Sequence, residues 1–243
     1  MLILLPPSET KRPGGVGISI DRAAIIWAAL DLARDQLIHA LEQLCQDQSA
    51  AIKALGLGKK SAADLELNKH LMTAPTMPAL ERYSGVLYEA LGFATLSTAG
   101  LQRANEKLFI QSALFGLLPA MEQIPNYRFS ASSKLPGINL KSVWQKAHEA
   151  VWPRMIGDIL DLRSLEYREL NPVPQERAYF NVEVVSTDGK ALNHFNKKSK
   201  GLFTRSALEH GLDSISDVSR VAQLAGLQAS VEGQTVKLVA PSN

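Results

Sequence analysis

The chain has 243 residues, and its 26 lysines and arginines nearly balance 24 aspartates and glutamates, which leaves a formal net charge of +2. This balance excludes a polyanion binder that works through bulk charge, so a nucleic-acid surface would have to come from local clustering. The single cysteine, Cys45, excludes an intrachain disulfide and a metal cage of several thiolates, as expected in a reducing cytoplasm. The length suffices for one large core, and we expect a single domain over residues 1–243.

The first expected element is a buried strand over residues 2–5, Leu-Ile-Leu-Leu, which ends at Pro6-Pro7. This run is too short for the apolar region of a signal peptide and has no basic segment before it. No stretch of the chain approaches the length that spans a bilayer. We therefore expect a cytoplasmic protein with no membrane partner.

The loop after this strand carries Ser8, Glu9 and Lys11. Loops that leave buried strands commonly carry function, although Ser8 and Glu9 are also typical turn and capping residues. Asp21 is the expected N-cap of a long helix over residues 25–44, in which apolar residues recur every three or four positions.

A glycine hairpin follows between two expected helices, over residues 49–55 and 61–72. Gly56 and Gly58 let the backbone turn in few residues, so that its N–H groups and the positive end of the next helix can point outward together. Lys59 and Lys60 add charge there. The pattern resembles the helix-hairpin-helix motif of sequence-independent DNA-binding proteins, and we expect such an element at about 49–72. The alternative is a helix C-cap followed by an ordinary tight turn.

The remaining elements follow from periodicity and from Gly and Pro breaks. We expect helices over 77–91, 98–106, 140–151, 164–170, 194–210 and 215–225, and strands over 108–114, 155–162, 179–185, 228–232 and 235–239. Residues 115–132 are expected to be loop, and a turn is expected at Asp188-Gly189. Helices and strands interleave without a regular period, so the expected fold is α+β or mixed α/β, with a central mixed sheet flanked by helices.

The expected helix over 194–210 has a basic face. Residues 190–208 contain no acid and carry five cations: Lys190, Lys197, Lys198, Lys200 and Arg205. At about 100° per residue, most of these fall on one side of the helix with His194 and Gly201. Gly201 leaves a notch where another group can approach the backbone. The alternative is a solvated basic face with no ligand.

Several motifs, in this order, resemble the bacterial YaaA family, also called UPF0246 or DUF328. The matching segments are residues 2–11 with Pro-Pro-Ser-Glu-Thr-Lys, 82–88 with Arg-Tyr-Ser-Gly-Val-Leu-Tyr, 114–118, Tyr127-Arg128, 161–164 with Tyr167, and 197–205 with Lys-Lys-Ser-Lys-Gly-Leu-Phe-Thr-Arg. Two positions depart from the family pattern: Leu118-Pro119-Ala120 replaces Leu-Arg-Pro, and Asn126-Tyr127-Arg128 replaces Pro-Tyr-Arg.

The resemblance implies a peroxide-stress protein that limits free iron and DNA damage. It also implies a mixed α/β body with a helix-hairpin-helix-like element and a positively charged cleft that binds DNA. The first functional hypothesis is thus a sequence-independent, salt-sensitive DNA-binding protein. Its expected DNA-binding residues are Gly56, Gly58, Lys59, Lys60, Lys197, Lys198, Lys200 and Arg205.

The alternative is an enzyme that acts on an anionic or phosphorylated small molecule in a cleft with Ser8, Lys11, Arg128, Lys197 and Arg205. The residues expected to line the cleft are Ser8, Lys11, Arg82, Tyr83, Arg128 and Gly201. We assign no catalytic residue. If the chain is an enzyme, the candidates are Ser8, Glu9, Lys11 and Lys197.

A metal site is not expected, because the five histidines show no ligand spacing and Asp158 and Asp161 stand at odd spacing on one expected strand. No cofactor is expected either. An iron-sequestering function has only the phenotype of the resembled family in its favour, so we expect any effect on iron to be indirect.

Overall fold

The computed structural model describes the chain except residues 18, 21–24, 59–61, 187–193 and 241–243. It shows a mixed α/β fold with a seven-stranded sheet and a separate two-stranded sheet. Asp21, Lys59, Lys60, Lys190 and the turn at Asp188-Gly189 lie outside the described residues.

The main sheet is largely parallel, with antiparallel strands at both edges. Its order is β4 (Gly116–Pro119), β3 (Leu108–Ser112), β1 (Leu2–Leu5), β6 (Ile159–Asp161), β7 (Tyr179–Val185), β9 (Thr235–Val239) and β8 (Gln228–Glu232). β1 pairs in parallel with β3 on one side and with β6 on the other. All four residues of β1 are buried, as expected for a central strand covered on both faces.

The connections of the sheet change direction beside β1. The chain leaves β1 for β3 on one side, whereas it leaves β6 for β7 on the other. The loops after β1 and β6 therefore diverge and leave a crevice at the carboxyl ends of these strands. In open α/β sheets, ligands bind at such a switch point.

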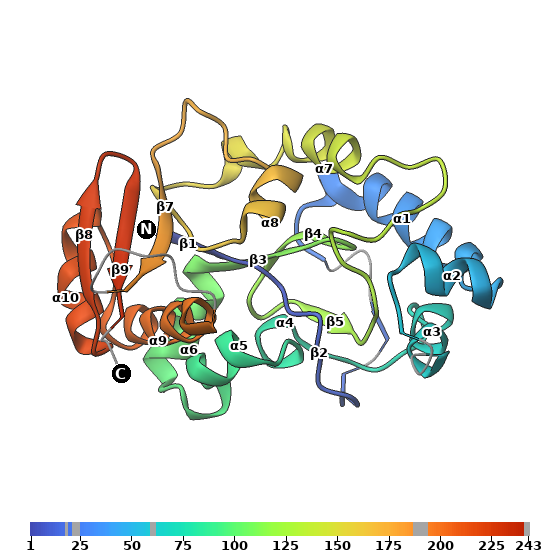
Figure 1. The fold of residues 1–243 in the computed structure, drawn as a ribbon, viewed down its shortest axis with the longest axis horizontal. Helices are drawn as coiled ribbons and strands as arrows, with labels where there is room; N and C mark the ends of the chain where they lie inside the picture. Colours follow the sequence, from blue (N-terminus) through green and yellow to red (C-terminus); the bar gives the residue numbers. More distant parts are fainter. Residues whose placement is uncertain (18, 21–24, 59–61, 187–193, 241–243) are drawn as a thin grey trace.

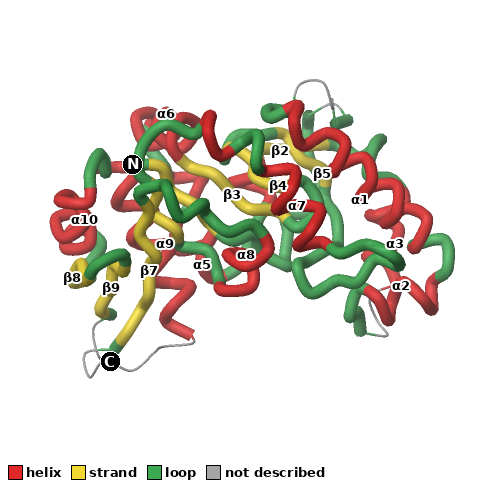
Figure 2. Tube along the Cα trace, turned by 90° about the horizontal axis from the view of Figure 1, so that it is seen from above, coloured by secondary structure: helices red, strands yellow, loops and turns green. Residues whose placement is uncertain are grey.

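The helices gather in groups along the molecule. They are α1 (Asp31–Leu44), α2 (Gln48–Ala54), α3 (Ala62–Lys69), α4 (Ala79–Arg82), α5 (Val86–Leu91), α6 (Thr98–Lys107), α7 (Leu140–His148), α8 (Leu165–Leu170), α9 (His194–His210) and α10 (Val218–Leu224). Short 3₁₀ turns are η1 (Ala28–Leu30), η2 (Phe93–Thr95), η3 (Trp152–Arg154) and η4 (Ile215–Asp217). Figures 1 and 2 place α1, α2 and α3 at one end of the long axis and α10, β8 and β9 at the other.

Several predicted elements are confirmed, among them the helices at α6, α8 and α9 and the hairpin of β8 and β9. The predicted helix over 77–91 is wrong. It divides into β2 (Thr76–Pro78), α4 and α5, because Tyr83 is extended and Gly85 has φ +96°. The predicted start of a helix at residue 25 is also wrong, because η1 precedes α1 and Trp27 has φ +69°.

Residues 115–132 are not all loop, contrary to the expectation. Residues 116–119 form edge strand β4, and β5 (Gln123–Pro125) pairs antiparallel with β2. Pro119 and Pro125 end these short strands, a position that proline tolerates. The predicted strand over 155–162 is likewise shorter, and only residues 159–161 form β6.

Helix α9 packs closely on α5, and Gly201 makes this contact possible. A Cβ atom at Gly201 would overlap the Leu87 carbonyl oxygen and lie 2.8 Å from the Cβ of Ala90. The predicted notch at Gly201 therefore exists, but α5 fills it.

We expect the Gly201→Ala substitution to lower the free energy of unfolding by about 1–3 kcal/mol, because the added methyl group must push α5 and α9 apart. Urea unfolding at neutral pH measures this change. Gly58→Ala is the matched control, since a Cβ there has no neighbour within 4 Å. Equal stabilities of the two variants would contradict the packing argument.

Candidate functional site

A cavity of about 630 Å³, here called the crevice, lies at the carboxyl ends of β1 and β6. Five segments that are distant in sequence meet around it: the loop after β1, the turn that begins α5, the start of α8, the loop at Ser130 and the first turn of α9. Its lining comprises Pro6, Pro7, Ser8, Glu9, Thr10, Ser84, Gly85, Val86, Leu87, Tyr88, Ser130, Ser164, Glu166, Tyr167 and Lys197. The crevice thus occupies the switch point of the sheet.

Hydrogen bonds hold the β1 loop against the turn before α5. Tyr88 Oη donates to the Pro6 carbonyl at 2.7 Å, and Thr10 Oγ1 donates to the Ser84 carbonyl at 3.2 Å. Gly85 is needed at this contact: a Cβ atom there would lie 3.1 Å from Thr10 Oγ1 and 3.2 Å from Ser8 Oγ. This packing places Ser8 and Glu9 on the crevice wall.

Lys11 lies outside the crevice lining and supports the β1 loop. Its ammonium group donates to the carbonyls of Ser8 at 3.1 Å and Glu9 at 3.4 Å, and it lies 4.1 Å from the centroid of the Tyr127 ring. Burial, and secondarily the nearby Arg128 charge, lower the pKa of Lys11 to about 7. Lys11 therefore titrates near neutral pH.

Tyr83 and Tyr127 form a buried hydroxyl chain beside Lys11. Their hydroxyl oxygens are 2.7 Å apart, and Ser112 Oγ lies 2.8 Å from Tyr127 Oη. Burial raises the pKa of both tyrosines well above its ordinary value. Tyr83, expected in the cleft, is therefore a neutral residue of the core that tethers α4 to the segment before Arg128.

Arg82 and Arg205 bind backbone carbonyls away from the crevice. The fully buried Arg82 guanidinium donates to the carbonyls of residues 12, 14, 75 and 124. Arg205 donates to the carbonyls of residues 91, 92 and 95 and so holds the end of α5. Neither arginine lines the crevice, which differs from the sequence-based expectation that placed both in the cleft. Gly201 is buried under α5 and does not line the crevice either.

Gly56 and Gly58 lie in the segment between α2 and α3, and both are exposed. Gly56 has φ +63°, and its N–H donates to the Lys53 carbonyl at 3.4 Å. The apolar residue between the glycines, Leu57, is buried, and its N–H donates to the Ile52 carbonyl at 2.9 Å. Among the described residues, no other group lies within 4 Å of the place of a Cβ at either glycine, which leaves the backbone there open to a ligand.

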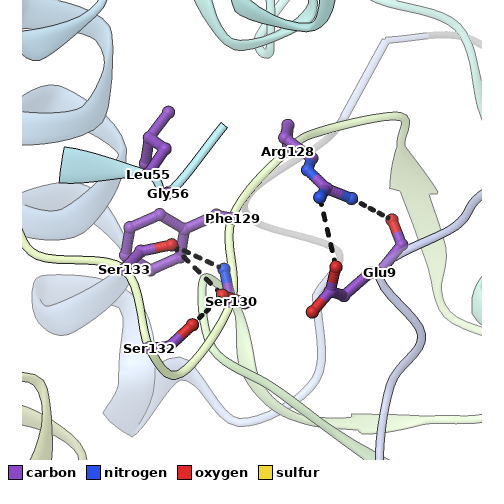
Figure 3. A pocket seen from close by; sticks show the side chains of 8 residues that line it. All are labelled: Glu9, Leu55, Gly56, Arg128, Phe129, Ser130, Ser132 and Ser133. Atoms are coloured by element: carbon purple, nitrogen blue, oxygen red, sulfur yellow. Dashed lines mark hydrogen bonds and ion pairs between the residues drawn. The ribbon is translucent and has the colours of Figure 1, made fainter. Parts of the chain in front are cut away.

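A smaller cavity of about 80 Å³, here called the hairpin cavity, connects Gly56 to the crevice. Figure 3 shows Arg128 pointing at Glu9, with Leu55 and Gly56 across from them. Arg128 donates to the Glu9 carbonyl at 3.0 Å and to its carboxylate at 3.1 Å. The remaining lining residues are Phe129, Ser130, Ser132 and Ser133. Glu9 and Ser130 also line the crevice, so the two cavities adjoin.

A third cavity of about 450 Å³, here called the basic cavity, adjoins the crevice on its other side. The two share Pro6, Leu87, Ser164 and Lys197. Lys200 also lines the basic cavity, is only 7% exposed and donates to the Leu162 carbonyl at 2.9 Å. Burial lowers the pKa of Lys200 to about 8.

The predicted basic face of α9 is therefore divided. Lys197 and Lys198 are exposed, Lys200 is recessed in the basic cavity, and Arg205 is bound to α5. The sequence analysis missed Arg168, Ser130, Ser164 and Glu166 as lining residues. The position of Ser164 after β6, which matches that of Ser8 after β1, could have revealed it.

In the part of the chain that the structure describes, no group of three or more His, Cys, Asp or Glu side chains could hold a metal ion. Among the same residues, no helix combines the length and the apolar character that a membrane crossing requires.

The fold and the crevice define an α/β protein with its candidate site at the switch point of a mostly parallel sheet. Residues 1–232 match the family model described as peroxide stress protein YaaA. The chain therefore belongs to the YaaA peroxide stress protein family, also named UPF0246.

Three curated UPF0246 proteins illustrate the similarity. The protein of Corynebacterium glutamicum strain R is 41% identical over 239 residues, covering 93% of this chain and 94% of its own. That of Corynebacterium efficiens is 40% identical over 254 aligned positions, covering 98% and 100%. That of Streptomyces coelicolor is 36% identical over 242, covering 96% and 93%.

The lowered pKa of Lys11 predicts a pH dependence of stability. The unfolded chain binds the Lys11 proton up to about pH 10.5, whereas the folded chain releases it near pH 7. The protonated lysine thus destabilises the fold, and this cost disappears as the pH rises through that window. We expect the free energy of unfolding of Lys11→Met to rise less than that of the wild type between about pH 6 and about pH 9.

Urea unfolding at several pH values measures this difference. Lys53→Met, at an exposed position of α2, is the matched control and should retain the wild-type pH dependence. Parallel curves for Lys11→Met and the wild type would contradict the assignment.

Proposed function

We propose that this protein acts in the cytoplasm in the peroxide-stress response, as a DNA-binding protein that protects DNA and limits free iron. One observation supports this proposal: the crevice shares some lining residues with the hairpin cavity and others with the basic cavity. Together, the three cavities form an elongated groove from Gly56 to Lys197, here called the trough. An extended polyanion fits a groove of this shape.

The residues along the trough suit a phosphate backbone. Exposed Gly56 and Gly58 allow close approach at one end, next to Lys59 and Lys60 in the sequence. At the other end, Lys197 lines the trough, and Lys198 follows it on the same exposed turn. Cations, serine hydroxyls and backbone N–H groups are the usual partners of DNA phosphates, and such contacts are independent of sequence.

The structure narrows the set of groups proposed to bind DNA. Lys200 is recessed, and Arg205 is committed to the end of α5. We therefore assign the main contacts to Gly56, Gly58, Lys59, Lys60, Lys197 and Lys198. Arg128 can join them by exchanging the Glu9 carboxylate for a phosphate. We assign no residue to the limitation of free iron, which we propose to be indirect.

Salt dependence tests DNA binding. Each phosphate contact contributes about 0.9 to the slope of log affinity against log salt for duplex DNA. We expect the double substitution Lys197→Ala with Lys198→Ala to lower this slope by about 1.8, and Lys59→Ala with Lys60→Ala to act similarly. Fluorescence anisotropy with a labelled duplex at several salt concentrations measures the slope.

Lys146→Ala is the control, because Lys146 is exposed on α7 and lines none of the three cavities. Absence of wild-type binding to duplex DNA at low salt, or an unchanged slope in both double variants, would refute the DNA-binding proposal.

A second function, catalysis on an anionic or phosphorylated small molecule, is favoured by the size of the crevice. Its volume of about 630 Å³ lies in the ordinary range of small-molecule sites. Ser8 and Lys197 both line this cavity, and Glu9 and Glu166 supply carboxylates. Of the predicted catalytic candidates, Ser8, Glu9 and Lys197 line this cavity, whereas Lys11 supports the loop.

A further inference from the structure

The basic cavity brings together three cationic side chains from two helices. Arg168 projects from α8, and Lys197 and Lys200 project from α9. Arg168 was not selected by sequence motifs, and the DNA-binding proposal does not use it. The cavity also contains Arg163, but this residue forms a fully buried ion pair with Asp161 at 2.7 Å, so the pair adds no net charge.

These three charges are incompletely compensated by the protein. Glu183, on β7, is the acidic residue among the lining residues that the structure describes. Three cations thus face one carboxylate. Buried or partly buried like charges raise each other's free energy, and a bound anion relieves this repulsion.

The hydrogen-bonding state of the cations also points to a missing acceptor. Arg168 Nε is buried and has no hydrogen-bond partner among the residues that the structure describes. Lys200 uses one N–H for the Leu162 carbonyl, which leaves two more donors on its ammonium group. Burial is the main cause of the lowered pKa of Lys200, and the Arg168 charge is the second, so the two cations lie close enough to repel. A buried donor without a partner is costly, and such groups usually meet a ligand or water.

We propose that the basic cavity binds a phosphate group of a small phosphorylated molecule, with Arg168, Lys197 and Lys200 as its protein ligands. Arginine and lysine together are typical phosphate ligands, since the planar guanidinium can donate two parallel hydrogen bonds. Because Lys197 and Ser164 line both cavities, the rest of the molecule extends from the basic cavity into the crevice.

A small molecule fits this site better than a DNA backbone. Lys200 is only 7% exposed, so a phosphate must enter the cavity to reach it. The inference deepens the second proposed function by naming its phosphate subsite, and it does not depend on DNA binding.

Calorimetric titration of the 243-residue chain with inorganic pyrophosphate tests the proposal. We expect Arg168→Gln and Lys200→Gln each to weaken pyrophosphate binding at least about tenfold. This is the typical loss of affinity when one hydrogen bond to a charged group is removed. Glu183→Gln should tighten binding, because it removes the opposing carboxylate. Arg154→Gln is the matched control, since Arg154 is exposed and lies outside the basic cavity and the crevice.

A parallel titration with duplex DNA distinguishes between a small phosphorylated molecule and a DNA backbone as the source of the phosphate. Arg168→Gln should retain the wild-type affinity for DNA while losing pyrophosphate, which would support the subsite. Equal losses for DNA and pyrophosphate would overturn it in favour of a DNA contact. Absence of pyrophosphate binding to the wild type, or unchanged binding in both variants, would also overturn it.

Thermal unfolding of each variant confirms folding, and Lys200→Gln decides the test if Arg168→Gln does not fold. Binding of pyrophosphate needs no turnover. The phosphate subsite can therefore be confirmed even if the proposed enzymatic function is refuted.

Discussion

The parallel pairing of β1 with both β3 and β6 is the constraint on which the rest of the structure depends. A strand of four apolar residues, buried throughout, holds the centre of the sheet. Since the chain leaves this centre in opposite directions, the loops after β1 and β6 diverge, and neither fills the space between them. The crevice is the space that results, and the Pro6-Pro7 start of the β1 loop keeps its wall in place.

The position of Lys197 depends on a second contact, between α9 and α5. Gly201 lets α9 lie against α5, and Arg205 fastens α9 to the carbonyls at the end of α5. Because α5 begins at the turn that contacts the β1 loop, the two helices and the loop form one connected wall. The residues of the basic segment 190–208 thus have different roles. Some of them form this wall, whereas Lys197 lines the cavities.

Buried arginine side chains hold distant segments of this molecule together. Arg82 joins three loop carbonyls to one carbonyl of β5, Arg34 binds the carbonyls of residues 26, 27 and 115, and Arg163 pairs with Asp161. In each case the buried guanidinium uses its several N–H donors on acceptors from other segments of the chain. Arg168 differs from these three, because its buried Nε has no hydrogen-bond partner within the described part of the chain, while its side chain lines a cavity.

Local and strong patterns in the sequence were enough to predict several elements and the family. The apolar run of β1, the amphipathic α6, the helix at 194–210 and the hairpin of β8 and β9 could all be predicted, because spacing and turn residues within each segment specify them. Only the tertiary structure decided which segments pair. Strands β4 and β5 are too short to show a period, and the extended break at Tyr83 depends on its bridge to Lys11. The same limit applies to the candidate site: a sequence shows that a residue is cationic, but its role depends on acceptors brought from distant segments, as the contrast between Arg205 and Arg168 shows.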